Sequence, residues 1–165
     1  MNQKDASRAN DYVSRIIDSQ ILSLGRNKAM AWIIFKLGDS EHSLEVYSSF
    51  RIKDNNKILV ANLDMYEPTE SLSGNESFDY DAFDWDAKGA NRYDEWIEDV
   101  GLASLSGLKV VDTKVNSCGD LTILLEQYIE IEVFLNHITY LCWRLLDLDL
   151  GNLFEMLGTG IGKEQ

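Results

Sequence analysis

The residues best suited to chemistry lie between positions 64 and 99, where carboxylates and aromatic rings are interleaved. This stretch holds twelve Asp or Glu residues against one Lys and one Arg, and the whole chain has a net charge of −13. Carboxylates match Lys and Arg, while aromatic rings supply apolar anchors and cation–π faces. We therefore predict a surface that binds a basic protein partner, made of Asp79, Asp81, Asp84, Trp85, Asp86, Tyr93, Asp94, Glu95 and Trp96. The alternative is an acidic face that only keeps the protein soluble.

The same stretch contains part of a calcium-loop pattern. Asp84, Asp86, Gly89 and Glu95 occupy positions 1, 3, 6 and 12 of a loop of the EF-hand type. Lys88 stands at position 5, where a cation would repel calcium, so we predict no specific calcium binding and no metal cofactor. Catalysis by these carboxylates would need at least one of them to be rigid and desolvated. Their crowding indicates a solvated loop instead.

Nucleophilic catalysis finds little support in the sequence. The chain has two histidines and two cysteines, none of them within a catalytic signature: His42, His137, Cys118 and Cys142. Two cysteines are usually free thiols in a reducing compartment. We predict that the protein is not an enzyme.

A glycine-rich segment near the end of the chain imitates a phosphate-binding loop. In Gly158–Lys163 the first glycine of that motif is replaced by Leu157, and Glu164 stands where Ser or Thr would hold magnesium. The segment therefore predicts no nucleotide site, and we expect no cofactor.

Composition restricts the class of partner. The 165 residues have a pI of about 4.4, which argues against nucleic acid and against an anionic membrane surface. No apolar run approaches the roughly 18 residues of a membrane span, and residues 1–5 carry no apolar signal region. These observations predict a cytoplasmic protein that folds as a single domain.

The stretch from 118 to 146 has the clearest secondary-structure signal. Residues 121–125, 128–134 and 140–146 are apolar or alternating runs separated by short polar breaks. In the middle run Ile131 and Val133 share one face, while Glu130 and Glu132 share the other, which is typical of a half-buried strand. Short breaks favour antiparallel neighbours, so we predict a three-stranded meander.

A weaker copy of this pattern stands in the first half of the chain. The sequence around Glu45 and Tyr47 resembles that around Glu132 and Phe134, and Phe50-Arg-Ile52 resembles Trp143-Arg-Leu145. This likeness indicates two repeated β-meanders. Its alternative is that any two alternating meanders look alike.

Together the patterns predict an α+β fold. We expect a mostly antiparallel sheet of six to eight strands, with an N-terminal helix packed on it because apolar residues recur at helical spacing near the start. The expected parts are a helix over 5–19, a first meander over 21–63, an acidic aromatic insertion over 64–99, a second meander over 108–146, and a tail over 151–165 that begins with a short helix and then frays.

The closing strands also resemble a group of small bacterial proteins. Gly119-Asp-Leu121, then Val133-Phe134, then Trp143-Arg-Leu145 are similar to the closing strands of immunity-type proteins, which neutralise toxins used in bacterial competition. Glu126-Gln127 departs from the turn usual in that pattern. The resemblance covers residues 20–146 and implies a cytosolic toxin-neutralising protein, but it names no site residue. The alternative function is a small ligand-binding protein or enzyme with a pocket on the sheet face.

Overall fold

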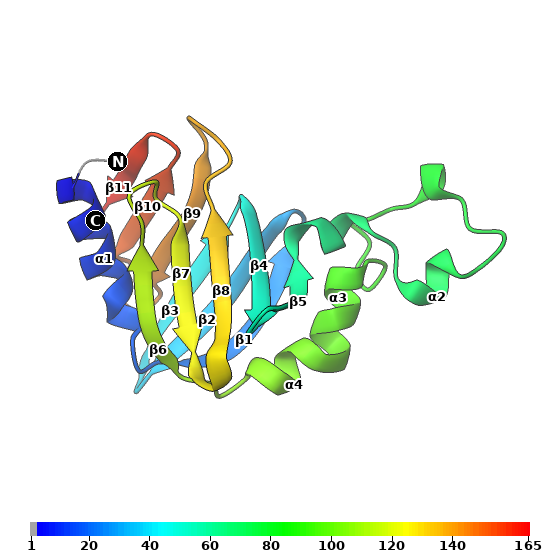
Figure 1. Ribbon diagram of the computed structural model, residues 1–165, viewed down its shortest axis with the longest axis horizontal. Coiled ribbons are helices and arrows are strands. Elements are labelled where there is room, and N and C mark those ends of the chain that lie inside the picture. Colours follow the sequence, from blue (N-terminus) through cyan, green and yellow to red (C-terminus); the bar gives the residue numbers. More distant parts are fainter. Residues whose placement is uncertain (1–2) are drawn as a thin grey trace.

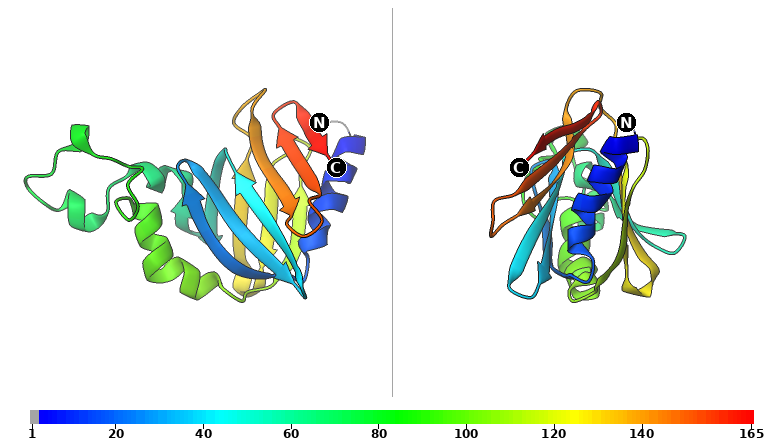
Figure 2. Two further views of the ribbon diagram at one scale, coloured as in Figure 1. Left: turned by 180° about the vertical axis from the view of Figure 1, so that it is seen from behind. Right: turned by 90° about the vertical axis from the view of Figure 1, so that its left-hand side faces the viewer.

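The computed structural model describes residues 3–165, whose strands form two antiparallel sheets that face each other (Figures 1 and 2). The first sheet has six strands, in the order β1 (Gln20–Asn27), β2 (Met30–Leu37), β3 (Ser40–Val46), β9 (Leu141–Asp147), β10 (Leu153–Leu157) and β11 (Gly160–Glu164). The second sheet has five, in the order β5 (Lys57–Ala61), β4 (Ser49–Asp54), β8 (Ile129–Phe134), β7 (Leu121–Leu125) and β6 (Val110–Val115).

Alternating side chains from both sheets build the core between them. On β8, Ile131 and Val133 are 1% and 0% exposed, whereas Glu130 and Glu132 lie on the outward face. This arrangement confirms the predicted orientation of the strand. β2 repeats the pattern with Ile33 and Phe35 in the core. Burial of one face therefore accounts for the alternation seen in the sequence.

The predicted N-terminal helix is confirmed and closes one end of the two sheets. It comprises α1 (Gln3–Val13) and the short 3₁₀ turn η1 (Ser14–Ile16). Ala9, Val13 and Ile16 form its buried stripe. Asn10 ties it to β6, because its side chain both donates to the Val115 carbonyl and accepts from the Val115 N–H.

A second group of helices covers the opposite end (Figure 1). The segments that cover it are η2 (Asn62–Tyr66), α3 (Arg92–Trp96), the π-helical turn η4 (Ile97–Gly101) and α4 (Leu102–Leu105). Two further turns, α2 (Glu70–Ser73) and η3 (Tyr80–Ala82), lie on a segment that projects from this end. Met65, Tyr93 and Leu105 insert into the core, and α3 and α4 contact β5 and β1. A further 3₁₀ turn, η5 (Glu126–Tyr128), joins β7 to β8. No helix among residues 3–165 is long and apolar enough to cross a membrane.

The chain changes sheet twice, which corrects the predicted three-stranded meander over 118–146. β7 and β8 are neighbours, but β8 pairs next with β4, and β9 lies in the other sheet between β3 and β10. The same change occurs between β3 and β4. Period-2 alternation marks a strand but carries no information about which strand it pairs with, so short breaks alone suggested sequential neighbours.

The two halves of the chain repeat the same arrangement. Strands β1–β5 correspond in order to β6–β10. When each strand is replaced by its counterpart in the other half, the pairing of β3 with β9 becomes the pairing of β8 with β4. A helix precedes each half, α1 before β1 and α4 before β6. The strand order therefore agrees with the internal repeat that the sequence indicated.

The α+β class and the antiparallel pairing are confirmed, but residues 3–165 form eleven strands rather than six to eight, and these strands make two sheets. The predicted helix in the tail is wrong, because residues 153–164 form the hairpin of β10 and β11. Phe154 and Met156 are fully buried and Glu155 points outward. The apolar positions 153, 154, 156 and 157 also fit helical spacing over so short a segment, but the segment pairs with β9 and is a strand.

Candidate functional site

The predicted acidic segment forms an arm that projects from the two sheets (Figure 1). We define the acidic arm as residues 69–90. Backbone pairing closes its base, since Pro68 and Asn91 form a β-bridge, the Thr69 N–H donates to the Ala90 carbonyl at 3.1 Å, and the Arg92 N–H donates to the Glu67 carbonyl at 2.9 Å. The arm therefore begins and ends at one point, like a large Ω-loop.

Asn91 organises the base of the arm. Its side chain is completely buried and caps α3, because its Oδ1 accepts a hydrogen bond from the Asp94 N–H at 2.9 Å. Its Nδ2 donates to the Trp85 carbonyl at 2.8 Å, and this bond holds the C-terminal part of the arm against the helix. The Trp85 ring contacts Tyr66 with ring centroids 4.9 Å apart. One amide side chain thus fixes both the helix start and the path of the arm.

Arg26, at the end of β1, clamps the arm to the first sheet. Its guanidinium donates from Nε to Asp94 Oδ1 at 2.7 Å and from Nη2 to Asp94 Oδ2 at 2.8 Å, and it reaches Asp86 Oδ1 at 3.3 Å. The Arg26 side chain is only 6% exposed. Asp94 Oδ2 also accepts from the Gly89 N–H at 2.8 Å. This two-bond geometry is the strong form of an Arg–carboxylate pair.

The clamp changes the acidity of both partners. Burial by itself would raise the pKa of Asp94, but hydrogen bonds from Arg26 and from the Gly89 N–H, together with the charges of Arg26 and Lys88, hold that pKa below its usual value. The hydrogen bond to Asp94 raises the pKa of Arg26. Both groups are therefore charged at neutral pH, and the pair is ionic.

Three of the predicted partner-binding residues make contacts within the fold. Tyr93 is 1% exposed, Asp94 is 8% exposed and bound to Arg26, and Trp96 packs half-buried against Gly101, where an added methyl group would lie 2.6 Å from its ring. In this conformation these side chains pack or pair within the fold. Trp85 and Glu95 are half-buried.

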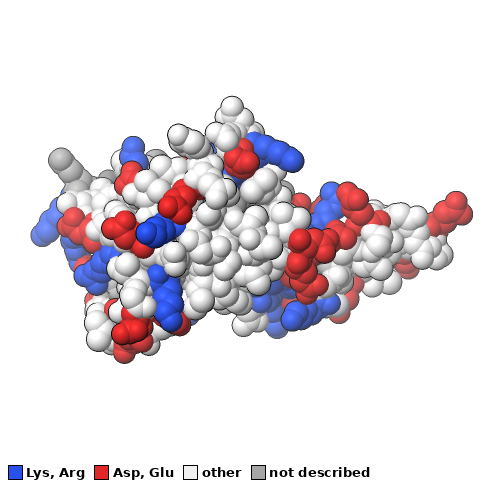
Figure 3. Space-filling view, turned by 90° about the horizontal axis from the view of Figure 1, so that it is seen from below, with Lys and Arg blue, Asp and Glu red and all other residues white. Residues whose placement is uncertain are grey.

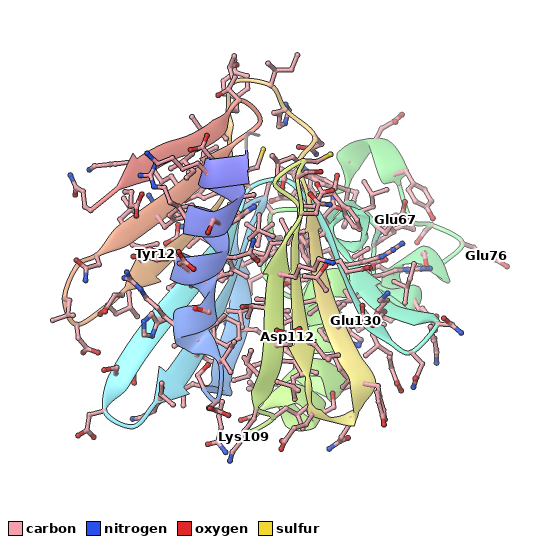
Figure 4. All side chains as sticks on the ribbon, turned by 60° about the vertical axis from the view of Figure 1, so that its left-hand side comes forward. Tyr12, Glu67, Glu76, Lys109, Asp112 and Glu130 are labelled. Carbon is pink, nitrogen blue, oxygen red and sulfur yellow. The ribbon has the colours of Figure 1, made fainter. Side chains whose placement is uncertain are left out.

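The remaining predicted carboxylates lie on the arm surface. Asp79, Asp81, Asp84 and Asp86 are exposed. Asp79 and Asp84 also accept hydrogen bonds from the backbone N–H groups two residues ahead, at 3.0 and 3.1 Å, and so shape the turns of the arm. Figure 3 shows acidic side chains both at the far end of the arm and where it leaves the body, and Figure 4 shows Glu76 pointing away at the far end.

An aromatic cluster on the arm was not among the predicted site residues. The Phe78 ring lies 4.8 Å from that of Tyr80 and 5.8 Å from that of Phe83, and Tyr80 is 63% exposed. The clustering depends on the 3₁₀ turn η3, which brings residues of close sequence spacing onto one side. Their aromatic character was visible in the sequence, but their grouping was not.

Beside the base of the arm runs a cavity of about 630 Å³. It lies along β1 and is lined by Trp32 on β2 and by Ile97 and Leu102 on the helical segment, which comprises α3, η4 and α4 (residues 92–105), with charged side chains at the arm end. Asp86 and Asp94 are the predicted site residues that border it. We call it the β1 groove. Sequence patterns gave no sign of it, because its walls come from three separate segments.

The other candidate centres in the sequence are the histidines and the cysteines. Among residues 3–165 no group of three or more His, Cys, Asp or Glu side chains is arranged to hold a metal ion. His42 Nε2 lies 3.9 Å from Asp147 Oδ2 inside the fold, and His137 packs its ring against Tyr140. Both cysteines are free thiols, Cys118 exposed and Cys142 buried.

Comparisons with protein-family models, with curated proteins and with solved structures found no match to this chain.

Proposed function

We propose that the protein is a non-enzymatic binding protein that neutralises a basic protein partner, and that the partner is a toxin of bacterial competition. The observation that carries this proposal is the acidic arm, a projecting loop whose base is closed by backbone pairing and by the Arg26–Asp94 clamp. A loop held away from the core in this manner presents its side chains outward without depending on them for stability.

The charge of the arm supports a cationic partner. The arm carries six acidic residues and one lysine. Five of the six have no lysine or arginine within ion-pair distance in the part of the chain that the structure describes: Glu70, Glu76, Asp79, Asp81 and Asp84. Unpaired carboxylates of one sign attract a basic protein over long distances and accelerate association. Intramolecular pairing would have cancelled that attraction.

The exposed aromatic cluster supports the same partner. Tyr80 presents an accessible ring between Asp79 and Asp81 in the sequence, with Phe78 packed against it and Phe83 packed against Phe78. A lysine or arginine that stacks on this ring would meet a carboxylate on either side. Aromatic residues are also common among the side chains that dominate binding energy at interfaces.

The toxin-neutralising class rests on the resemblance of the closing strands to immunity-type proteins. The acidic arm is compatible with that class, because neutralising a basic toxin requires a complementary acidic surface. On this proposal the protein acts in the cytoplasm and needs no cofactor, metal or substrate.

The deciding experiment is co-expression with the product of the neighbouring gene. Affinity capture of the tagged protein should retain that product, and co-expression should restore growth to cells that it would otherwise inhibit. A variant with Asp79→Asn, Asp81→Asn and Tyr80→Ala should lose both effects while it keeps the melting temperature of the wild type. Full protection of cells by this variant would contradict the role of the arm.

A further inference from the structure

The β1 groove has the size and lining of a small-molecule site. Its volume of about 630 Å³ falls within the range of roughly 300–1,000 Å³ that is usual for ligand pockets. Trp32 lines the groove from β2, and Ile97 and Leu102 line it from η4 and α4. The Trp32 ring lies directly on Gly25, where an added methyl group would be 2.5 Å from the ring, so the ring itself forms a flat surface of the groove. These surfaces suit a planar apolar group.

The ends of the groove differ because the helical segment runs against β1. Asp94 pairs with Arg26 near the end of β1, whereas the Gly107 N–H donates to the Ile21 carbonyl near its start. The charged side chains of Arg26, Lys28, Asp86 and Lys88 therefore gather at the arm end. Leu102 lies toward the other end, and it is 41% exposed at the rim.

Two lysines border the arm end without a carboxylate of their own. Arg26 pairs with both Asp94 and Asp86, and neither Lys28 nor Lys88 has an acidic oxygen within ion-pair distance among residues 3–165. Both side chains are exposed and border the groove, one from the β1–β2 turn and one from the arm. They supply two cations to this end of the groove in a protein of net charge −13.

Glu98 completes the set of polar groups. It lines the groove from the π-helical turn, is exposed, and has no ion pair among the described residues. A carboxylate is an acceptor that an N–H donor of a ring bound in the groove could use. The groove thus offers an apolar slot, a nearby acceptor, and a pair of cations at one end.

We propose that the β1 groove binds a heteroaromatic carboxylate, with the ring against Trp32, Ile97 and Leu102, the carboxylate at Lys28 and Lys88, and a ring N–H directed to Glu98. This activity is separate from partner binding by the exposed face of the arm. It gives the protein a ligand that borders the base of the arm, since Lys88 and Asp86 belong to both features.

The test uses three probes that share an indole ring and differ in charge: indole-3-propionate, its neutral amide, and tryptamine. Binding to the full-length protein is followed by NMR through the Trp32 indole N–H and the Ile97 and Leu102 methyl groups. For a ligand of this size we expect a dissociation constant of about 1 mM or below for the acid. The amide should bind about three- to tenfold more weakly, as expected for the loss of two exposed ion pairs, and tryptamine more weakly still.

Matched variants separate the site from general charge effects. Lys28→Gln with Lys88→Gln should weaken the acid to the level of the amide and leave the amide unchanged, while Lys57→Gln with Lys163→Gln, equal in charge and outside the groove, should change neither. Leu102→Trp, at an exposed rim position, should abolish binding of the acid by filling the slot.

Three results would overturn the proposal. They are tighter binding of tryptamine than of the acid, an unchanged affinity for the acid in the Lys28–Lys88 variant, and no saturable shift at about 10 mM, well above the expected dissociation constant. Tighter binding of tryptamine would assign the groove to the basic partner as an anchor for its side chains. None of these results affects the test of the arm, which is read out by capture of the neighbouring gene product.

Discussion

Arg144 on β9 and Glu45 on β3 form a hydrogen-bonded ion pair at the junction of the two halves, with Nε and Nη2 of the arginine 2.8 and 2.7 Å from Glu45 Oε2. Arg51 on β4 and Glu132 on β8 form the equivalent pair in the other sheet. Each arginine also lies over an aromatic ring, Arg144 over Tyr47 and Arg51 over Phe134.

The equivalence of these two groups follows from the internal repeat. Glu45-Val-Tyr47 and Glu132-Val-Phe134 occupy matching positions, as do Arg51 and Arg144. Each arginine comes from the strand that follows a change of sheet, and each glutamate from the strand that precedes one. The two groups therefore join the halves where strands of different repeats meet.

Each pair should stabilise the fold by a measurable amount. Removing Arg144, Glu45 or both should give a coupling energy of about 1 kcal/mol, because the pair is partly shielded from water and well aligned. Arg51 with Glu132 should give a similar value. Urea denaturation of the single and double variants measures both, and coupling near zero would mean that the groups only occupy the surface.

Ile131 should be essential for the core. Ile131→Ala removes a side chain that is 1% exposed and should lower the free energy of unfolding by about 2–5 kcal/mol. Lys114→Ala, on exposed β6, is the control and should change stability by less than about 0.5 kcal/mol. A loss for Ile131→Ala as small as the loss for the control, measured by chemical denaturation, would show that the inward face of β8 is assigned wrongly.

Asp94→Asn tests the clamp at the base of the arm. The change leaves the buried Arg26 guanidinium without its main counter-charge and should destabilise the protein by about 3 kcal/mol. Asp79→Asn removes an equal charge from an exposed site and should have almost no effect. Thermal melts of both variants make the comparison, and similar melting temperatures would rule out a structural role for the clamp.

The clamp also predicts how stability depends on pH. The pKa of Asp94 in the folded protein lies below its ordinary value of 3.8, and the pKa of Glu132 lies below 4.5, so folding favours the ionised carboxylates. Their contribution is fully present above these ordinary values and is lost as the pH falls through the lower values of the folded state. Urea denaturation between pH 7 and pH 3 should therefore show a smaller acid-induced loss of stability in Asp94→Asn than in the wild type.

The arm should act on the partner through two separable kinetic effects. Asp79→Asn with Asp81→Asn should slow association and flatten its salt dependence, because exposed carboxylates act through long-range attraction. Tyr80→Ala should accelerate dissociation. If the ring is a dominant contact, the change should weaken the binding free energy by about 2 kcal/mol. Surface plasmon resonance against the captured partner at two salt concentrations measures both.

Trp96→Ala is expected to lower stability instead, since that ring packs against Gly101. Wild-type kinetics in all arm variants would move the binding surface elsewhere.

Local patterning in the sequence determined the identity and the facing of most elements. Apolar residues at helical spacing specified α1, and alternation specified the buried face of β8, because each depends only on which side of an element meets the core. The internal repeat and the acidic character of the arm were also legible. These properties depend on residues that are close in the sequence, so they can be predicted without knowledge of the fold.

Only the tertiary structure decided which strands pair and which acidic residues are free. Alternation in β8 and β9 is the same whether the two strands share a sheet or lie in opposite sheets, so the change of sheet depends on the strands already in place. Asp94 and Asp79 look equivalent in the sequence, yet Arg26, 68 residues from Asp94, withdraws one from solvent and leaves the other exposed. Pairing between distant residues is a property of the folded chain, and it separates the carboxylates that build the arm from those that remain available for a partner.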